Sequence, residues 1–229
     1  MNNNLNNVFI GFDSKEEIAS LICEYSIKKY SKNKIKINHL KLEELRKKGL
    51  YKRTHDNLSS TEFTFSRFLV PFLMNYEGWA VFCDSDFLWI DDINKLFSLK
   101  DNKFAVMCVH HEYEPKNIQK KIGAKQLLYP RKNWSSMVLW NCSHPSNKKV
   151  NLEMVNRETG KYLHRFGWLE DKEIGQVGIE WNWLVGWYEN EKIKPKAIHF
   201  TEGGPWLNDE YKSNKYADMW LKMEKEFKS

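Results

Sequence analysis

The sequence predicts an α/β fold, with a mainly parallel central sheet flanked by helices. The chain opens with a β-α-β-α pattern, in which apolar, strand-like runs alternate with segments of helical periodicity. Its 229 residues are 41% hydrophobic and 14% aromatic, enough for one large core. We therefore expect a single domain over residues 1–229, closed by an amphipathic helix at about 211–228.

The elements follow in order along the chain. An apolar run at 8–12 indicates a buried strand, and apolar residues at helical spacing predict a helix as far as Tyr30. Alternation at 35–39 predicts a second strand, and Gly49 ends a short helix. The later segments are a helix at 64–76 kinked at Pro71, the strand before Asp84, a short helix at 93–99, strands at 104–109, 136–140 and 198–200, and a helical stretch at 152–163 broken near Gly160.

The bulk composition excludes several classes of protein. The net charge is +6, but Lys and Arg are scattered among acidic residues, which is typical of a solvated surface. No nucleic-acid-binding motif is present, so we expect no nucleic-acid partner. Of the four cysteines, Cys83 and Cys108 lie in apolar runs and none forms a CxxC pair, which suits a reducing compartment. No run approaches the about 18 apolar residues of a membrane span, so we expect a cytoplasmic protein.

Two carboxylates, Asp84 and Asp86, interrupt an apolar stretch that resumes at once in Phe87-Leu88-Trp89. An unpaired buried charge is costly, and a divalent cation supplies the compensation. At positions i and i+2 of an extended backbone the two side chains point the same way and share one ion. The alternative is a surface turn with two solvated acids.

His199 ends a later apolar run and is followed by Gly203, Gly204 and Pro205. Imidazole is a good ligand for Mn²⁺ beside carboxylates, and adjacent glycines let backbone N–H groups approach a phosphate closely. Taken alone, such a histidine is also common as a hydrogen-bonded core residue.

Together these features resemble the GT-A glycosyltransferases, most closely glycosyltransferase family 8, which includes glycogenin-like enzymes and lipopolysaccharide galactosyltransferases. The resemblance covers Val8 to about Trp206. It implies a Rossmann-like nucleotide-sugar-binding fold and Mn²⁺ or Mg²⁺ as cofactor. It also implies a nucleotide-sugar donor, UDP-linked in most of that family, and a glycan, lipid or protein as acceptor.

The resemblance also implies roles for individual residues. The metal ligands would be Asp84, Asp86 and His199. Donor-binding residues would be Phe12, Asp13, Arg67, Asp84, Ser85, Gly203, Gly204 and Trp206. Residues near the transferred sugar would be Asp171, Glu170 and Asn182 as catalytic candidates, with Ser135 and Ser136 in the strand beside them. Each of these has an ordinary alternative, such as a helix-capping acid or a core strand residue.

One departure from the family pattern concerns the segment after His199. The usual motif is H-x-x-G-x-x-K-P-W, in which the lysine contacts the diphosphate. Here Glu202 stands at the expected glycine and no lysine precedes Pro205. Backbone N–H groups of the two glycines would take over part of that role.

The predicted reaction is the transfer of a sugar from a nucleotide-sugar to a hydroxyl group, with the metal ion acting as a Lewis acid on the departing diphosphate. The resemblance implies retention of anomeric configuration. No residue stands out as a covalent nucleophile, which favours front-face attack. Two alternatives remain: a degenerate sugar-nucleotide or glycan-binding module, and a metal-dependent nucleotidyltransferase or phosphatase.

Overall fold

The computed structural model describes residues 5–54, 61–112, 131–188, 192–213 and 215–229. The strands are β1 (Asn6–Gly11), β2 (Ile35–Leu40), β3 (Trp79–Cys83), β4 (Phe87–Trp89), β5 (Val106–Cys108), β6 (Met137–Asn141), β7 (Ile174–Gln176), β8 (Trp183–Leu184) and β9 (Ala197–His199). The α-helices are α1 (Glu17–Tyr30), α2 (Leu42–Lys47), α3 (Val70–Leu73), α4 (Asn94–Phe97), α5 (Leu152–Arg157), α6 (Gly160–His164) and α7 (Ala217–Phe227).

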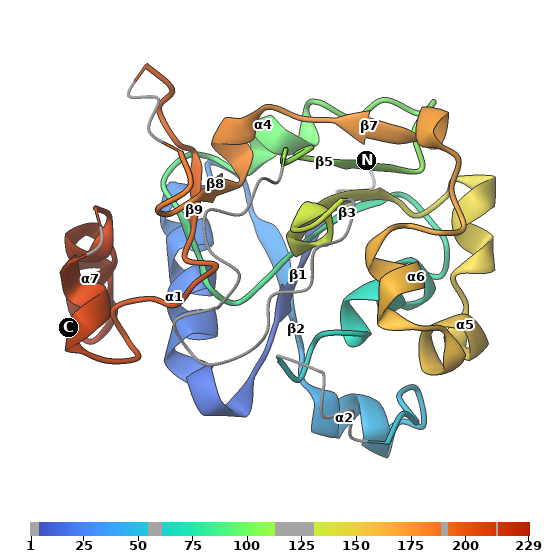
Figure 1. Ribbon diagram of the computed structural model, residues 1–229, viewed down its shortest axis with the longest axis horizontal. Coiled ribbons are helices and arrows are strands. Elements are labelled where there is room, and N and C mark those ends of the chain that lie inside the picture. Colours follow the sequence, from blue (N-terminus) through green and yellow to red (C-terminus); the bar gives the residue numbers. More distant parts are fainter. Residues whose placement is uncertain (1–4, 55–60, 113–130, 189–191, 214) are drawn as a thin grey trace.

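The central sheet has the strand order β2-β1-β3-β6-β5-β7 (Figure 1). All of its neighbouring pairs are parallel except those that involve β6, which runs antiparallel to both β3 and β5. The expected α/β fold with a mainly parallel sheet is therefore confirmed. Because β1 and β3 are parallel neighbours, their carboxyl ends lie at one edge, where substrates of open α/β sheets bind.

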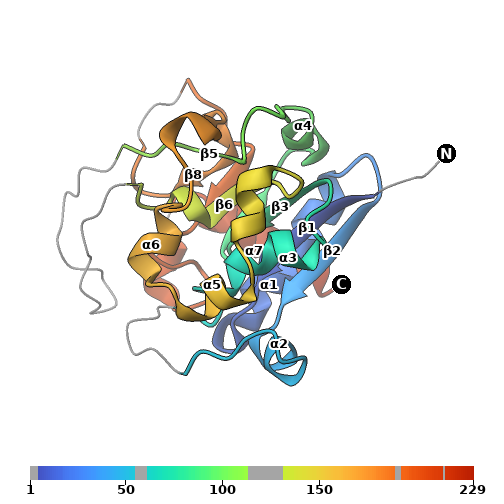
Figure 2. The same cartoon turned by 90° about the vertical axis from the view of Figure 1, so that its right-hand side faces the viewer.

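Alternate residues of β1 pack into separate cores on the two faces of the sheet. Phe9 joins the cluster covered by α3, α5 and α6, whereas Val8 and Ile10 join the cluster beneath α1 and β4. Figures 1 and 2 show α1 on one face and α5 and α6 on the other. Burial on both faces explains the continuous apolar run of the first strand.

A second, three-stranded sheet lies beside α1, in the order β4-β9-β8. Strand β4 begins directly after Asp86 and pairs antiparallel with β9. A third apolar cluster joins this sheet to α1 and α7, with Ile22, Leu88, Ile198 and Trp220 at its centre. The small sheet thereby fixes the end of β9 against the segment that follows β3.

The element boundaries differ clearly from the expected ones in two places. The helix expected at 64–76 is a 3₁₀ turn, Ser66–Leu69, followed by the short α3, with Pro71 in its first turn. The C-terminal helix begins at Ala217 rather than near 211, because Asp209–Ser213 form a separate 3₁₀ turn. The polar, irregular segment at 110–133, for which its composition predicts a loop, lies mostly outside the described residues. Every helix of the described part is too short or too polar to span a membrane.

Candidate metal centre and substrate pocket

The ends of three strands bring Asp84, Asp86 and His199 together. Asp84 directly follows β3, and Asp86 directly precedes β4. The first residue of β4, Phe87, pairs with His199 at the end of β9, and the Asp86 carbonyl accepts a hydrogen bond from the backbone N–H of Phe200 at 3.0 Å. The second sheet therefore holds the histidine beside the two carboxylates.

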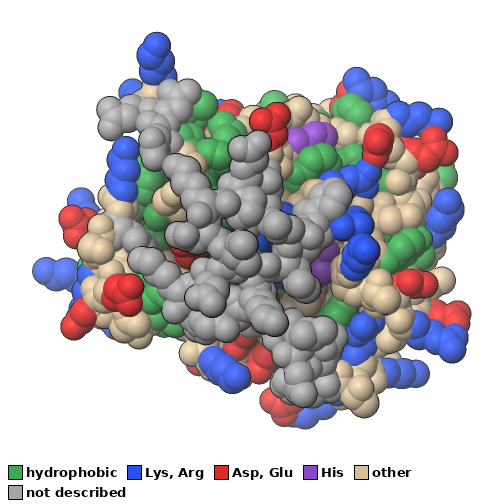
Figure 3. Space-filling view, in the orientation of Figure 1, with side chains coloured by type: hydrophobic (Ala, Val, Ile, Leu, Met, Phe, Trp, Pro, Cys, Tyr) green, Lys and Arg blue, Asp and Glu red, His purple; other side chains and the backbone are tan. Residues whose placement is uncertain are grey.

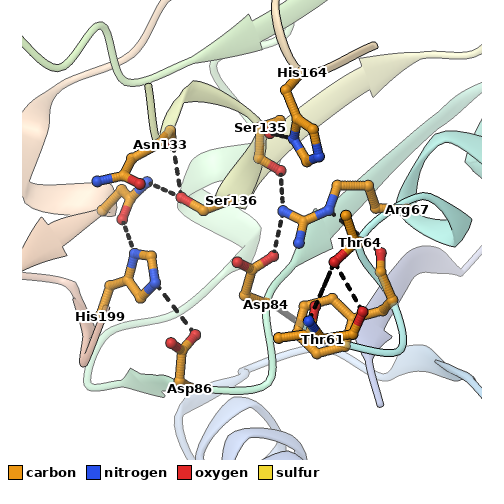
Figure 4. Close-up of polar contacts among 12 residues, drawn as sticks. Thr61, Thr64, Arg67, Asp84, Asp86, Asn133, Ser135, Ser136, His164 and His199 are labelled. Carbon is orange, nitrogen blue, oxygen red and sulfur yellow. Dashed lines mark hydrogen bonds and ion pairs between the residues drawn. The ribbon is translucent and has the colours of Figure 1, made fainter. Parts of the chain in front are cut away.

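One ligand atom from each of these three side chains lies within 4.8 Å of the other two (Figure 4). The backbone at Ser85 and Asp86 forms a turn, so the expected extended conformation is wrong. The turn, rather than strand alternation, directs both carboxylates toward one space. His199 is buried and stacks on Phe87 with ring centroids 4.4 Å apart. The three side chains form a candidate metal-binding triad.

A chain of hydrogen bonds fixes the orientation of the His199 ring. The Ser136 hydroxyl donates to the carbonyl of Asn133 at 2.7 Å, so its oxygen is left to accept from Nδ2 of Asn182 at 2.9 Å. Oδ1 of Asn182 then faces Nδ1 of His199 at 2.9 Å, which requires a proton on that nitrogen. The other nitrogen, Nε2, lies 3.2 Å from Asp86 and is the one that faces the proposed metal position.

Arg67 supplies a cation to the centre. Its Nη1 lies 2.7 Å from Asp84 and donates to the carbonyl of Ser135 at 3.0 Å. The guanidinium packs against the neighbouring rings of Phe63 and Phe82, 5.2 Å from the centroid of each. This apolar enclosure strengthens the ion pair and fixes its geometry.

Burial is the largest single influence on the pKa of both carboxyls, but the net shifts are opposite. Burial, assisted by the charge of Asp86, outweighs Arg67 and raises the pKa of Asp84 from 3.8 to about 7. Burial also opposes ionisation of Asp86, but the charge of His199 and its hydrogen bond outweigh it and lower the pKa of Asp86. The two coupled carboxyls therefore favour the state in which Asp86 is ionised and Asp84 titrates near neutrality.

The residues fit a divalent cation. Two carboxylates and one oriented imidazole nitrogen are ligands that such ions prefer. When His199 serves as a neutral ligand, Asp84 and Asp86 together exceed the positive charge that Arg67 provides, and a dication would remove this excess. It would also hold Asp84 in its ionised form, because metal binding displaces the proton of a ligand.

These residues line a pocket of about 830 Å³ at the carboxyl edge of the sheet. Its lining includes Asp13, Arg67, Ser85, Ser135, Ser136, Gly203 and Trp206 of the sequence-based candidates. A group of Lys and Arg side chains lies beside a histidine on the face shown in Figure 3. The pocket is large enough for a nucleotide-sized ligand.

Asp13 lies in the pocket wall, and its carboxylate already accepts two backbone hydrogen bonds, from Lys15 at 3.0 Å and Glu62 at 3.1 Å. It therefore ties the end of β1 to the segment before Arg67. Phe12 is not part of the pocket lining. Its ring packs edge-on against His39.

The Gly-Gly segment after His199 is shaped by Trp206. A Cβ on Gly204 would lie 1.9 Å from the Trp206 ring, and Gly203 has a φ of +116°. The indole N–H of Trp206 donates to Glu16 at 2.7 Å, and burial raises the pKa of this carboxyl despite that bond. Gly203 and Trp206 face the pocket, whereas Gly204 lies behind them.

Glu170 and Asp171 lie outside the pocket lining. Both side chains are highly exposed, and Asp171 contacts Arg131. The backbone N–H of Glu170 donates to Glu173 at 2.8 Å, which closes a 3₁₀ turn at the surface. The family resemblance places these two acids near the sugar, whereas in the structure they belong to a surface turn outside the pocket lining.

His164 is a pocket residue that sequence reasoning missed. It comes from α6, and its Nδ1 lies 2.7 Å from the hydroxyl of Ser135. Burial lowers its pKa to about 3, so it is neutral at physiological pH. A lone histidine in a polar helix gives no sequence signal, because only the packing of α6 against the sheet brings it to Ser135.

Solved structures share this fold. The bifunctional glycosyltransferase WbbM superposes with a TM-score of 0.67 at 16% identity, over 96% of this chain and 49% of its own. GlyE of Streptococcus pneumoniae superposes with a TM-score of 0.63 at 14% identity, over 97% of this chain and 60% of its own. The galactosyltransferase LgtC, solved with donor and acceptor sugar analogues, superposes with a TM-score of 0.62 at 9% identity, over 97% of this chain and 96% of its own. This chain thus spans about half of WbbM and most of LgtC.

The chain has the GT-A fold of glycosyltransferases, so the resemblance to family 8 is confirmed at the level of the fold. No family model matches the sequence. Protein CDI of Arabidopsis thaliana is 50% identical over 224 residues, which cover 96% of this chain and 86% of that protein. The chain belongs to the same family as Protein CDI.

Proposed function

We propose that residues 1–229 form one GT-A domain that transfers a sugar from a nucleotide-sugar to a hydroxyl group of an acceptor. The donor is UDP-linked, the ion is Mn²⁺ or Mg²⁺, and the acceptor is a glycan, a lipid or a protein. The observation that carries this proposal is the triad of Asp84, Asp86 and His199, which lies in a large pocket at the carboxyl edge of a GT-A sheet.

The triad supports donor binding through the ion that it would hold. The metal ion, when bound, supplies positive charge to the diphosphate and stabilises it as a leaving group. Asp84, Asp86 and His199 would hold the ion, while Asn182 keeps the ring nitrogen of His199 directed at it. Arg67 contacts Asp84 on the far side from His199 and orients that carboxylate (Figure 4).

The reacting sugar would lie beside Arg67, Ser135 and His164, the polar groups of the pocket next to the triad. We propose that the reaction retains the anomeric configuration. In this mechanism a departing phosphate oxygen accepts the proton of the acceptor hydroxyl on the same face of the sugar. The two acids of the triad, Asp84 and Asp86, are themselves the proposed metal ligands, so this mechanism does not assign the proton to either of them. Anomeric proton NMR of the product tests this step, and an inverted product would exclude it.

Thermal-shift and UDP-release assays with a panel of UDP-sugars, with and without Mn²⁺, test the function. We expect one donor to raise the melting temperature only with Mn²⁺, because ligand binding to the folded state raises apparent stability. Asp86→Ala should abolish this shift and the release of UDP. Asp101→Ala is the matched control, since Asp101 pairs with Lys103 outside the pocket.

The same assays separate an enzyme from a degenerate binding module. The absence of a lysine before Pro205 favours a module, because the diphosphate then lacks one cationic contact. Mn²⁺-dependent donor binding without release of UDP, in the presence of a broad acceptor panel, would identify a module. If no nucleotide-sugar binds in the presence of either ion, the proposed function is wrong.

A further inference from the structure

Acidic and basic side chains line different walls of the pocket. The carboxylates come from strand ends and from the loop after β9: Asp13, Glu16, Asp84, Asp86 and Glu202. The wall formed by the end of α5 and by α6 contributes basic side chains and no acid: Arg157, Lys161 and Arg165. Arg53 and Lys132 also line the pocket. The pocket is therefore polarised, with a carboxylate end and a cationic wall.

Arg53 is held rigidly in this cationic wall. Its guanidinium lies 3.7 Å from the centre of the Phe65 ring, and its Nη1 donates to the carbonyls of Val155 and Glu158, both at 2.9 Å. These acceptors are neutral, and no carboxylate of the described residues pairs with this guanidinium, so its positive charge is not neutralised. A fixed guanidinium loses little entropy when it binds a carboxylate or phosphate.

Lys161 adds a second positive charge. It is exposed in the first turn of α6, and the described residues offer it no carboxylate partner. Arg157 nearby differs, because it forms an ion pair with Glu153 at 2.7 Å in solvent. His164 follows Lys161 by three residues and shares its side of the helix, but it is neutral because burial lowers its pKa to about 3.

Short contacts connect this wall to the metal centre. His164 contacts the hydroxyl of Ser135, whose carbonyl accepts a bond from Arg67, and Arg67 pairs with Asp84 (Figure 4). The triad and the cationic wall therefore belong to one continuous pocket, which a single ligand can occupy. The diphosphate itself would lie at the triad, so the charges of Arg53 and Lys161 are left for another group.

We propose that the bound substrate carries a second anionic group, a carboxylate or a phosphate, which Arg53 and Lys161 bind. This inference rests on the proposed function, because it assigns the other end of the same pocket. The anion has two sources: the carboxylate of a uronic-acid donor, or an acidic or phosphorylated acceptor.

Calorimetric titrations in Mn²⁺ with matched ligand pairs distinguish these sources. The donor pair is UDP-glucuronic acid against UDP-glucose, which differ only at C6 of the sugar. The acceptor pair is glucose 6-phosphate against glucose, each added to protein saturated with UDP. We expect the anionic member of one pair to bind about tenfold more tightly, the effect of one charge-assisted contact.

Variants of Lys161 test the assignment. Lys161→Glu should abolish the preference and Lys161→Arg should keep it. The matched control Lys172→Glu, at an exposed lysine outside the pocket, should leave the preference unchanged. A preference that survives Lys161→Glu would overturn the assignment, and so would the absence of preference in both pairs.

Binding of UDP alone, measured in the same titrations, reports separately on the proposed function. If UDP binds with Mn²⁺ but neither pair shows a preference, the second anion site is wrong and the proposed function stands. If UDP fails to bind while glucose 6-phosphate alone binds and loses affinity in Lys161→Glu, the anion site stands and the proposed function is wrong.

Discussion

Oδ1 of Asn182 lies 2.9 Å from Nδ1 of His199 and sets the tautomer of a buried imidazole. The amide of Asn182 is itself oriented by its hydrogen bond to the Ser136 oxygen, because the Ser136 hydroxyl donates its proton to the carbonyl of Asn133. A single polar chain therefore decides which nitrogen of His199 faces Asp86. Such outer contacts commonly tune metal affinity as strongly as the ligands' own geometry.

Asn182→Ala should weaken Mn²⁺ binding by about 10-fold or more, because the imidazole loses its fixed orientation. Calorimetric titration of the metal measures this loss. Asn147→Ala is the control, since Asn147 is equally buried but bonds to the backbone of Ala105 and Asn141 away from the pocket. Both variants should lose stability, and only the first should lose metal affinity. Equal metal affinities in the two variants would contradict the role of Asn182.

Metal affinity should fall as the pH drops below 7. The pKa of Asp84 is raised from 3.8 to about 7, so the metal-free protein holds a proton there that Mn²⁺ must displace. We expect proton release on metal binding at pH 6 and little at pH 8.5, measured by calorimetry in buffers of different ionisation enthalpy. Asp84→Asn should weaken Mn²⁺ binding, because it removes a proposed ligand, and should abolish the proton release at pH 6.

The same shift predicts the pH dependence of stability without metal. A carboxyl whose pKa is raised on folding binds its proton more tightly in the folded state, so its contribution falls as pH rises from 4 to 7. The lowered pKa of Asp86 acts only at lower pH, because its contribution is lost as pH falls below its ordinary value of 3.8. In a chelating buffer, the melting temperature of the unaltered protein should therefore decline from pH 4 to 7. The melting temperature of Asp84→Asn should decline less.

Arg67→Met should lower the free energy of unfolding by about 3 kcal/mol, because it leaves Asp84 buried without its cation. Mn²⁺ should restore part of this loss by neutralising the carboxylate. Arg157→Met, which breaks the solvent-exposed pair with Glu153, should cost less than about 1 kcal/mol and show no rescue. Urea unfolding with and without Mn²⁺ measures both, and equal costs would argue against a strong Arg67–Asp84 pair.

Gly204→Ala should displace Trp206, whose ring lies 1.9 Å from the position of the added Cβ. We expect a loss of about 1–3 kcal/mol from overpacking, together with weaker binding of UDP, since Trp206 lines the pocket. Gly49→Ala provides the comparison. Its φ is +71° and the space around it is open, so only backbone strain of about 1 kcal/mol applies and UDP binding should not change.

The sequence predicted the parts of the site in which polar or charged residues interrupt or end a buried apolar run. Asp84 and Asp86 interrupt an apolar run, and His199 ends another, so their grouping followed from the expected parallel sheet and the family resemblance. The actual convergence comes from a turn at Ser85 and from the second sheet. Neither leaves a periodic pattern, since the strands of that sheet have only two or three residues.

The cationic wall was beyond sequence reasoning for a different reason. Arg53, Lys161 and His164 lie in polar segments whose composition is that of an ordinary surface, and long-range packing alone brings them to one pocket. Glu170 and Asp171 show the converse. Their position matched a functional segment of the family, but the backbone N–H of Glu170 donates to the Glu173 side chain and closes a surface turn there. Local hydrogen bonding accounts for these acids without any substrate.

The pairing of Phe87 with His199 has a consequence for folding kinetics. Asp86 and His199 lie 113 residues apart (199 minus 86) and become neighbours only when β4 and β9 pair. Contacts of such long range form late, because loop closure must first be compensated. A metal ion held across this pairing should therefore slow unfolding far more than it speeds refolding. Removal of the ion would shorten the lifetime of the native state and leave the rate of folding almost unchanged.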